Sequence, residues 1–166
     1  MSLFDRRKLL MLPLATFLVA ACGFEPVYAP GGSGSALFGK VAVSAPNDVD
    51  SYLLVQNLEQ RLGRSAGQSD DYSLNVQVST VTQAAAITTT NETNRLTING
   101  QATYSLTSKA TGQVVSSGTA TDFVAYSAAG STVSTLASER AAKERLMIIL
   151  SDQIINRIYA TTDPAT

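Results

Sequence analysis

Few side chains in this 166-residue sequence are of the types that perform catalysis. Histidine is absent and cysteine occurs once, as Cys22, which excludes the common His-based catalysis, structural zinc sites and an intramolecular disulfide. Residues 31–35 read GGSGS and lack the final glycine of a G-x-S-x-G nucleophile elbow. A Ser/Lys pair would need Lys40, Lys109 or Lys143, and nothing around these lysines indicates burial. The sequence therefore predicts a protein that is not an enzyme, with no catalytic residue, no metal site and no cofactor.

The charged residues near the C-terminus have a structural explanation. Acidic and basic side chains alternate along a predicted helix, a pattern typical of a solvated helix face. These residues are Glu139, Glu144 and Asp152 among the acids, and Arg140, Lys143 and Arg145 among the bases. Glu139 and Lys143 also have the i,i+4 spacing that stabilises helices.

Arg95 is the one basic residue that suggests a binding role. It is the only cation between Arg64 and Lys109, and it lies where a polar Thr/Asn-rich segment enters a predicted strand. A guanidinium in that position could hold a phosphate group through two parallel hydrogen bonds. The alternative is a loop arginine that faces water or pairs with Glu92. Lys109, near the opposite turn, is a weaker candidate.

The N-terminus has the composition of an export signal. Arg6, Arg7 and Lys8 precede 13 apolar residues, 9–21, a run too short to span a bilayer but typical of a signal peptide. It ends in Val-Ala-Ala-Cys at residues 19–22, which resembles the lipobox of bacterial lipoproteins. This resemblance implies that residues 1–21 are removed and that Cys22 becomes lipidated, which would attach the chain to a membrane. The alternative is that Cys22 is an ordinary small apolar residue in a buried helix.

The composition of the remaining chain predicts one folded domain on a lipidated tether. Residues 22–39 contain Pro26, Pro30 and a Gly/Ser run, and we expect them to form a flexible tether. Residues 40–160 are expected to fold as a single domain and residues 161–166 to form a tail. A net charge of −1 does not fit a nucleic-acid-binding protein. Export by the general or the twin-arginine route stays open.

The periodicity of the sequence predicts an α+β fold with the order β-α-β-β-β-α. Alternation of apolar and polar residues indicates strands at 72–79, 96–107 and 113–126, and a short β-branched run at 40–44 indicates another. Leucines four residues apart predict a helix from Asn47 or Asp48 to Gly63, and a second apolar stripe predicts a helix over 134–159. We expect a four-stranded, largely antiparallel sheet with both helices on one face. The direction in which the first strand pairs is left open.

The alternation also predicts which side chains meet in the core. We expect apolar strand residues to pack against apolar helix residues; these are Leu74, Val76, Ile98 and Tyr104 against Leu54, Leu58, Leu146, Leu150 and Ile154. The opposite strand faces are expected to point outward; they contain Ser73, Asn75, Gln77, Thr97, Asn99, Gln101 and Thr103.

Several short motifs, in the same order, resemble the alphaproteobacterial branch of LptE, a family of lipopolysaccharide-assembly lipoproteins. The similarity begins with Cys-Gly-Phe-Glu-Pro-Val-Tyr-Ala-Pro at residues 22–30 and continues with Asp71-Tyr72-x-Leu74-x-Val76. It then includes Arg95, Ala102-x-Tyr104-x-Leu106 and Gln153-Ile154-x-x-Arg157-Ile158. The resemblance covers essentially the whole chain after residue 21.

The resemblance implies a non-enzymatic protein of the outer membrane. LptE proteins sit inside the lumen of the LptD barrel, assist its folding and help deliver lipopolysaccharide to the outer leaflet. The implied partners are therefore LptD, lipopolysaccharide and, through the lipid on Cys22, the membrane. Without residues 1–21 the chain carries 9 basic and 12 acidic groups, so a phosphate contact must be local, with Arg95 as the candidate. The alternative is a free-standing outer-membrane lipoprotein that binds a lipid or peptidoglycan without a barrel.

Overall fold

The structure is a computed structural model that describes residues 32–64, 70–87, 93–128 and 131–162. Seven elements follow one another along the chain. They are α2 (Ser33–Leu37), β1 (Val41–Val43), α3 (Val49–Arg61), β2 (Tyr72–Ile87), β3 (Thr93–Ser108), β4 (Val114–Ser127) and α4 (Thr132–Thr161).

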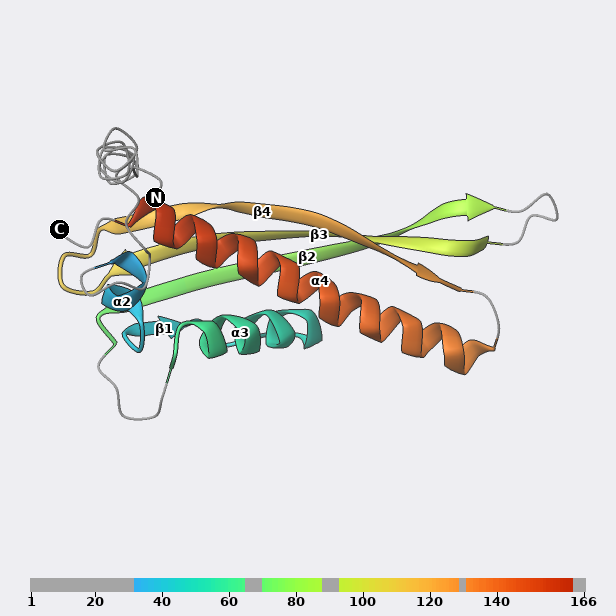
Figure 1. Ribbon diagram of the computed structural model, residues 1–166, viewed down its shortest axis with the longest axis horizontal. Helices are drawn as coiled ribbons and strands as arrows, with labels where there is room; N and C mark the ends of the chain where they lie inside the picture. The colour runs from blue at the N-terminus through green and yellow to red at the C-terminus, as the bar shows by residue number, and fades with distance from the viewer. Residues whose placement is uncertain (1–31, 65–69, 88–92, 129–130, 163–166) are drawn as a thin grey trace, which may run out of the picture.

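Four strands form one mixed sheet in the order β1-β2-β3-β4. The β2–β3 and β3–β4 pairs are antiparallel, and β1 pairs with the start of β2 in parallel over three residues. Figure 1 shows that β2, β3 and β4 are long and extend well beyond β1 and α3. The predicted α+β class and the predicted order of strands and helices are therefore confirmed, and the first strand pairs in parallel.

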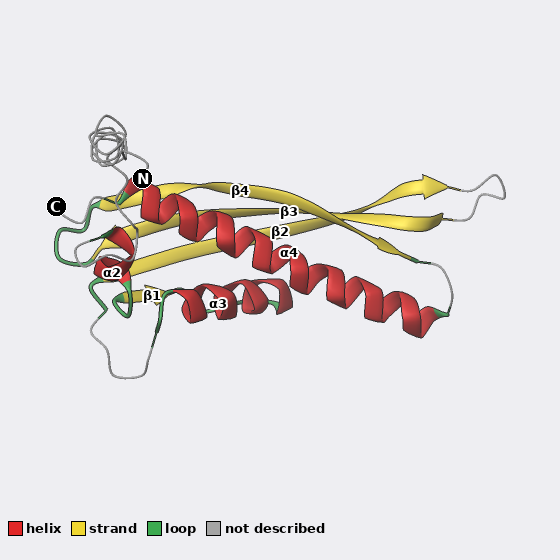
Figure 2. Ribbon diagram, viewed as in Figure 1, coloured by secondary structure: helices red, strands yellow, loops and turns green. Residues whose placement is uncertain are grey.

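Helices α3 and α4 cover one face of this sheet, as the periodicity predicts (Figure 2). All nine side chains expected to pack in the core are buried. Helix α4 lies close to β3 at Gly100, where a Cβ atom would lie 2.9 Å from Leu146 Cδ2 and 3.1 Å from Leu150 Cδ1. A glycine at this position therefore lets the 30-residue helix lie directly on the strand. No helix in the described ranges is both long and apolar enough to span a membrane.

Helix α3 begins and ends at residues whose types suit those positions. Asp48 is the N-cap: its Oδ1 accepts a hydrogen bond of 2.7 Å from the backbone N–H of Ser51, while Ser51 Oγ accepts one of 2.9 Å from the backbone N–H of Asp48. This reciprocal pair satisfies two N–H groups that the helix itself leaves open. Gly63 follows the last turn with φ of 66°, a left-handed conformation that favours glycine. The predicted limits of this helix are confirmed.

The capping carboxylate makes the stability of α3 dependent on pH. The backbone hydrogen bond from Ser51, followed by the hydrogen bond from its side chain, lowers the pKa of Asp48 below 3.8. We expect Asp48→Ala to reduce the free energy of unfolding by about 1 kcal/mol at neutral pH. This contribution is present above the ordinary pKa and is lost as pH falls through the lowered one. Denaturant unfolding from pH 7 to pH 2 should show the difference shrinking, whereas Asp48→Asn should remain close to wild type at pH 7; a difference that does not change with pH would contradict this explanation.

The segment before β1 differs from the prediction. Residues 33–37 form α2, in which Leu37 is fully buried and Ser33 Oγ donates a 2.7 Å hydrogen bond to the carbonyl of Tyr159 near the end of α4. The prediction of a flexible tether over 22–39 is therefore wrong for residues 33–39, because burial of Leu37 offsets the cost of ordering a Gly/Ser-rich run. Residues 22–31 lie outside the described residues.

Strand β2 is also longer than predicted. The apolar–polar alternation stops near Ser79, yet the ladder with β3 continues to Ile87 with register shifts after Ala84. Beyond Ser79 the side chains of Val81, Thr82 and Gln83 are exposed, although they point to both faces of the strand. Alternation arises only where one face is buried, so a strand that is open on both faces gives no such signal.

Candidate functional site

The face of the sheet that carries no helix is built from uncharged side chains along most of its length, and Arg95 continues the same alternation at its end. We call it the outer face and define it by alternate residues of the three long strands. They are 73, 75, 77, 79, 81 and 83 of β2; 97, 99, 101, 103, 105 and 107 of β3; and 117, 119, 121, 123 and 125 of β4. Fourteen of these 17 residues are Ser, Thr, Asn or Gln, and none of the 17 is charged. The other three are Val81, Phe123 and Ala125.

The residues expected on the polar strand faces all lie on the outer face. Six of them are exposed and Thr97 is half-buried. On this face, polar residues pair with polar residues of the neighbouring strand. Gln77 pairs with Thr103, and Thr103 pairs with Thr119. Hydroxyl and amide side chains both donate and accept hydrogen bonds, so the whole face can bond to a polar surface without placing a charge in it.

An open groove lies on the outer face, in the part of the sheet that extends beyond β1. It has a volume of about 360 Å³ and is lined by Ser79, Val81, Asn99, Gly100, Gln101, Thr121, Asp122 and Phe123. The ring of Phe123 is 64% exposed and Val81 is 56% exposed. These two side chains give an otherwise polar surface one apolar contact point. Sequence reasoning missed the groove, because the alternation in β4 is weak and did not show which face Phe123 occupies.

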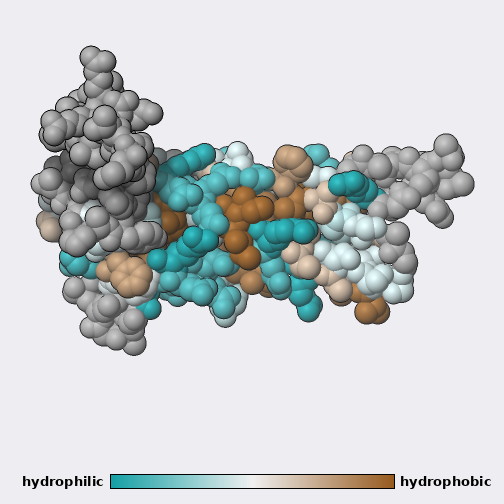
Figure 3. Space-filling model, viewed as in Figure 1, coloured by the Kyte–Doolittle hydropathy of each residue, from teal (hydrophilic) through white to brown (hydrophobic). Residues whose placement is uncertain are grey.

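The helix-bearing side of the molecule has a different surface. Figure 3 shows hydrophilic residues alternating with hydrophobic ones over α3 and α4. Arg61 of α3 forms an ion pair with Asp152 of α4, which links the two helices. Lys143 forms a second ion pair with Glu139 at 3.7 Å, within α4. Arg140, Glu144 and Arg145 are exposed, as expected of a solvated helix face. Glu139, Lys143 and Asp152 are instead partly buried in ion pairs.

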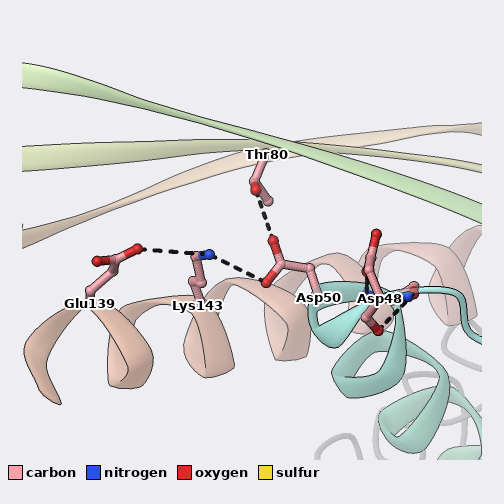
Figure 4. Close-up of polar contacts among 6 residues, drawn as sticks. Asp48, Asp50, Thr80, Glu139 and Lys143 are labelled. Atoms are coloured by element: carbon pink, nitrogen blue, oxygen red, sulfur yellow. Dashed lines mark hydrogen bonds and ion pairs between the residues drawn. The ribbon is translucent and has the colours of Figure 1, made fainter. Parts of the chain in front are cut away.

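Lys143 also belongs to a polar cluster that joins α4, α3 and β2 (Figure 4). Its Nζ lies 3.7 Å from Asp50 Oδ1, and Asp50 Oδ2 accepts a 2.8 Å hydrogen bond from Thr80 Oγ1. The Asp50 side chain is 17% exposed, so its charge is partly removed from water and gains from both partners. The cluster fixes the start of α3 against the middle of β2.

Arg95 lies near the free end of β3, opposite Ala86 of β2 and Ser127 of β4. It is exposed and borders a hollow of about 240 Å³ with Ala125, Tyr126 and Ser127. In the described part of the chain no ion pair holds its guanidinium, while Glu92 lies outside that part. Among the described residues that line this hollow, Arg95 is therefore the one accessible cation.

Lys109 lies at the opposite end of the molecule from Arg95. It follows the last residue of β3 and forms an ion pair of 3.7 Å with Asp70. The structure therefore does not bring the two candidate cations together. Within the described ranges, no group of three or more acidic or Cys side chains is arranged to hold a metal ion. Cys22, the predicted lipidation site, lies outside the described residues.

The architecture defines a class of α+β chains that includes several solved bacterial lipoproteins. A candidate lipoprotein from Caulobacter crescentus CB15 is 20% identical, with a TM-score of 0.64 over 76% of this chain and 92% of that chain. Rare lipoprotein B from Shewanella oneidensis is 10% identical, with a TM-score of 0.56 over 74% and 93%. The minor lipoprotein from Acinetobacter baumannii is 19% identical, with a TM-score of 0.51 over 75% and 93%. At these identities the likeness shows a common fold.

The family follows from the sequence. The LptE family, described as lipopolysaccharide-assembly, matches residues 38–158. This chain therefore belongs to the LptE family, and the resemblance drawn from its motifs is confirmed over that range. Among curated protein sequences, none matches the chain.

Proposed function

We propose that this protein is an outer-membrane lipoprotein that plugs the LptD barrel, assists its assembly and helps to insert lipopolysaccharide into the outer leaflet. The observation that carries this proposal is the uncharged outer face, on a chain that belongs to the LptE family. The lumen of an outer-membrane barrel is polar and hydrated. Hydroxyl and amide groups exchange hydrogen bonds with such a wall at little cost, whereas charged groups would lose hydration.

Lipidation of Cys22 would hold the protein at the periplasmic side of the outer membrane, where it could enter the barrel. Diacyl and amide-linked chains together bury enough methylene groups for a stable anchor. In this role the protein binds and positions its partners and carries out no catalytic step. Arg95 is the proposed contact for a phosphate of lipopolysaccharide, because it is exposed and no described ion pair occupies its guanidinium.

The test is an affinity purification of the full-length protein from detergent-solubilised outer membranes. We expect a large barrel protein to co-purify in equimolar amount. Recovery of the lipoprotein alone would contradict the proposal and favour a free-standing lipoprotein that binds a lipid or peptidoglycan.

A charge on the outer face should weaken this complex. Thr103 is exposed at the centre of the face, between Gln77 and Thr119. We expect Thr103→Glu to leave the isolated protein folded but to reduce the recovered barrel several-fold, because a buried carboxylate without a partner loses its hydration. Gln60→Glu, on an exposed position of α3, is the matched control and should leave recovery unchanged. Equal recovery of barrel with both variants would argue that the outer face meets no partner.

A further inference from the structure

The two long edges of the sheet differ in how their backbone groups are covered. Along β4, side chains of this chain occupy the outward groups. Arg157 donates to the carbonyl of Thr119, Gln153 Nε2 donates to the carbonyl of Thr121 at 3.4 Å, and Asp122 Oδ1 accepts from the N–H of Phe123 at 2.8 Å. Such capping prevents another strand from pairing with an edge.

The edge of β2 is covered only at its beginning. The N–H of Ser44 donates to the carbonyl of Leu74 at 2.8 Å, and Ser44 Oγ accepts from the N–H of Val76 at 3.2 Å. These bonds establish that even-numbered residues of β2 direct their backbone groups away from β3. Because this direction alternates along an antiparallel strand, the N–H and C=O groups of Val78, Thr80 and Thr82 also point outward.

These outward groups have no partner within the described ranges. The hydroxyl group of Thr80 donates a hydrogen bond to Asp50, but this bond does not involve the backbone N–H and C=O groups of Thr80. Residues 78–84 read VSTVTQA, without the charge, proline or glycine that commonly protects an exposed edge. A cavity of about 250 Å³, lined in part by Pro46, Asn47 and residues 76–78, lies where the covered part of the edge ends.

Residues 22–31 of this chain do not suit the open edge as a pairing strand. Residues 22–31 contain Pro26 and Pro30, which lack the N–H group that a ladder requires. The open edge directly borders the outer face at Ser79 and Val81, so a protein that covers this face also reaches the edge.

We propose that the edge of β2 from Val78 to Ala84 receives an extended strand of the barrel partner, which adds a fifth strand to the sheet. This inference rests on the proposed function. Only another extended backbone supplies donors and acceptors at the spacing of this edge. The docked strand is uncharged along this stretch, because its neighbours Ser79, Val81 and Thr82 provide no counter-charge and a buried charge would lose hydration.

The proposal is tested by Thr82→Pro in the full-length protein, purified from outer membranes as above. Proline removes an outward N–H that β3 does not use and obstructs the approach of a partner strand. We expect about a fivefold or greater loss of recovered barrel, as expected when a backbone hydrogen bond and its neighbours are lost. Thr82→Ser keeps the N–H group and is the matched control, with recovery equal to wild type.

A second measurement needs no substitution. In hydrogen exchange of the wild-type protein, we expect the amides of Val78, Thr80 and Thr82 to exchange about tenfold or more slowly in the barrel complex than in the free protein. This result supports the proposal even if Thr82→Pro fails to fold. Unchanged exchange at these amides in the complex would overturn it.

The outcomes separate this inference from the proposed function. Loss of barrel with Thr103→Glu but not with a folded Thr82→Pro would overturn strand docking and leave the proposed function intact. Recovery of wild-type protein without any barrel would overturn both. If two differently tagged copies of this chain co-purify and the edge amides are protected in that assembly without a barrel, the occupant is a second copy and the proposal of a barrel strand is wrong.

Discussion

Leu150→Ala should lower the free energy of unfolding by about 2–5 kcal/mol. Leu150 is fully buried in α4, and its side chain lies against Gly100 of β3. Truncation removes apolar contacts and leaves a cavity that a long helix on a rigid sheet cannot readily fill. Urea unfolding of the non-lipidated protein, followed by circular dichroism, measures the change.

The control for this substitution is Ile148→Ala on the same helix. Ile148 is 44% exposed, so its truncation should cost at most about 1 kcal/mol. Alanine is the better helix former at both positions, so a loss of stability cannot come from helix propensity. If both variants lose the same stability, the close contact of Leu150 with β3 does not carry the energy assigned to it.

Cys22→Ala should abolish attachment to the membrane. The proposed thioether can form only at a cysteine, and the chain contains no other. We expect the wild-type protein to have the mass of residues 22–166 plus three acyl chains, two on a thioether-linked glyceryl group and one amide-linked, and the variant to lack this increment. Intact-mass spectrometry and fractionation of membranes measure both results.

An unmodified polypeptide mass for the wild-type protein would show that Cys22 is not a lipidation site. Thr103→Glu serves as a control, because it leaves residues 1–22 intact and should carry the same lipid increment as wild type. The two variants therefore distinguish a failure of anchoring from a failure of partner binding.

Much of the fold could be predicted because most helices and strands bury one face. Leu54 and Leu58 in α3, and Leu146 and Leu150 in α4, repeat at helical spacing and are all fully buried. Elements without such a face were harder to predict. Helix α2 is only five residues long and rich in Gly and Ser, and its order depends on the distant contact between Ser33 and Tyr159.

The candidate surface could be predicted only in part. Alternation in β2 and β3 indicated which polar residues point outward, because the apolar residues between them had to face the helices. The capping of β4 by Gln153 and Arg157 depends on contacts about 30 to 40 residues apart in the chain. Such contacts leave no local pattern, so the contrast between a covered and an open edge required the structure.

The described structure begins at Gly32, soon after Cys22. This short spacing limits where Arg95 can lie relative to a lipid anchor on Cys22. Only nine residues lie between Cys22 and Gly32, so the two Cα atoms can be at most about 35 Å apart when the chain is fully extended. Helix α2 lies at the end of the molecule that bears the β3–β4 turn, and β3, whose third residue is Arg95, begins towards the other end (Figure 1). Strand β3 runs 13 residues from Arg95 to Ser108, about 43 Å. If the protein is anchored through a lipid on Cys22 and its long axis lies along the membrane normal, the domain would act as a spacer. It would then hold Arg95 at a distance from the leaflet in which the protein is anchored.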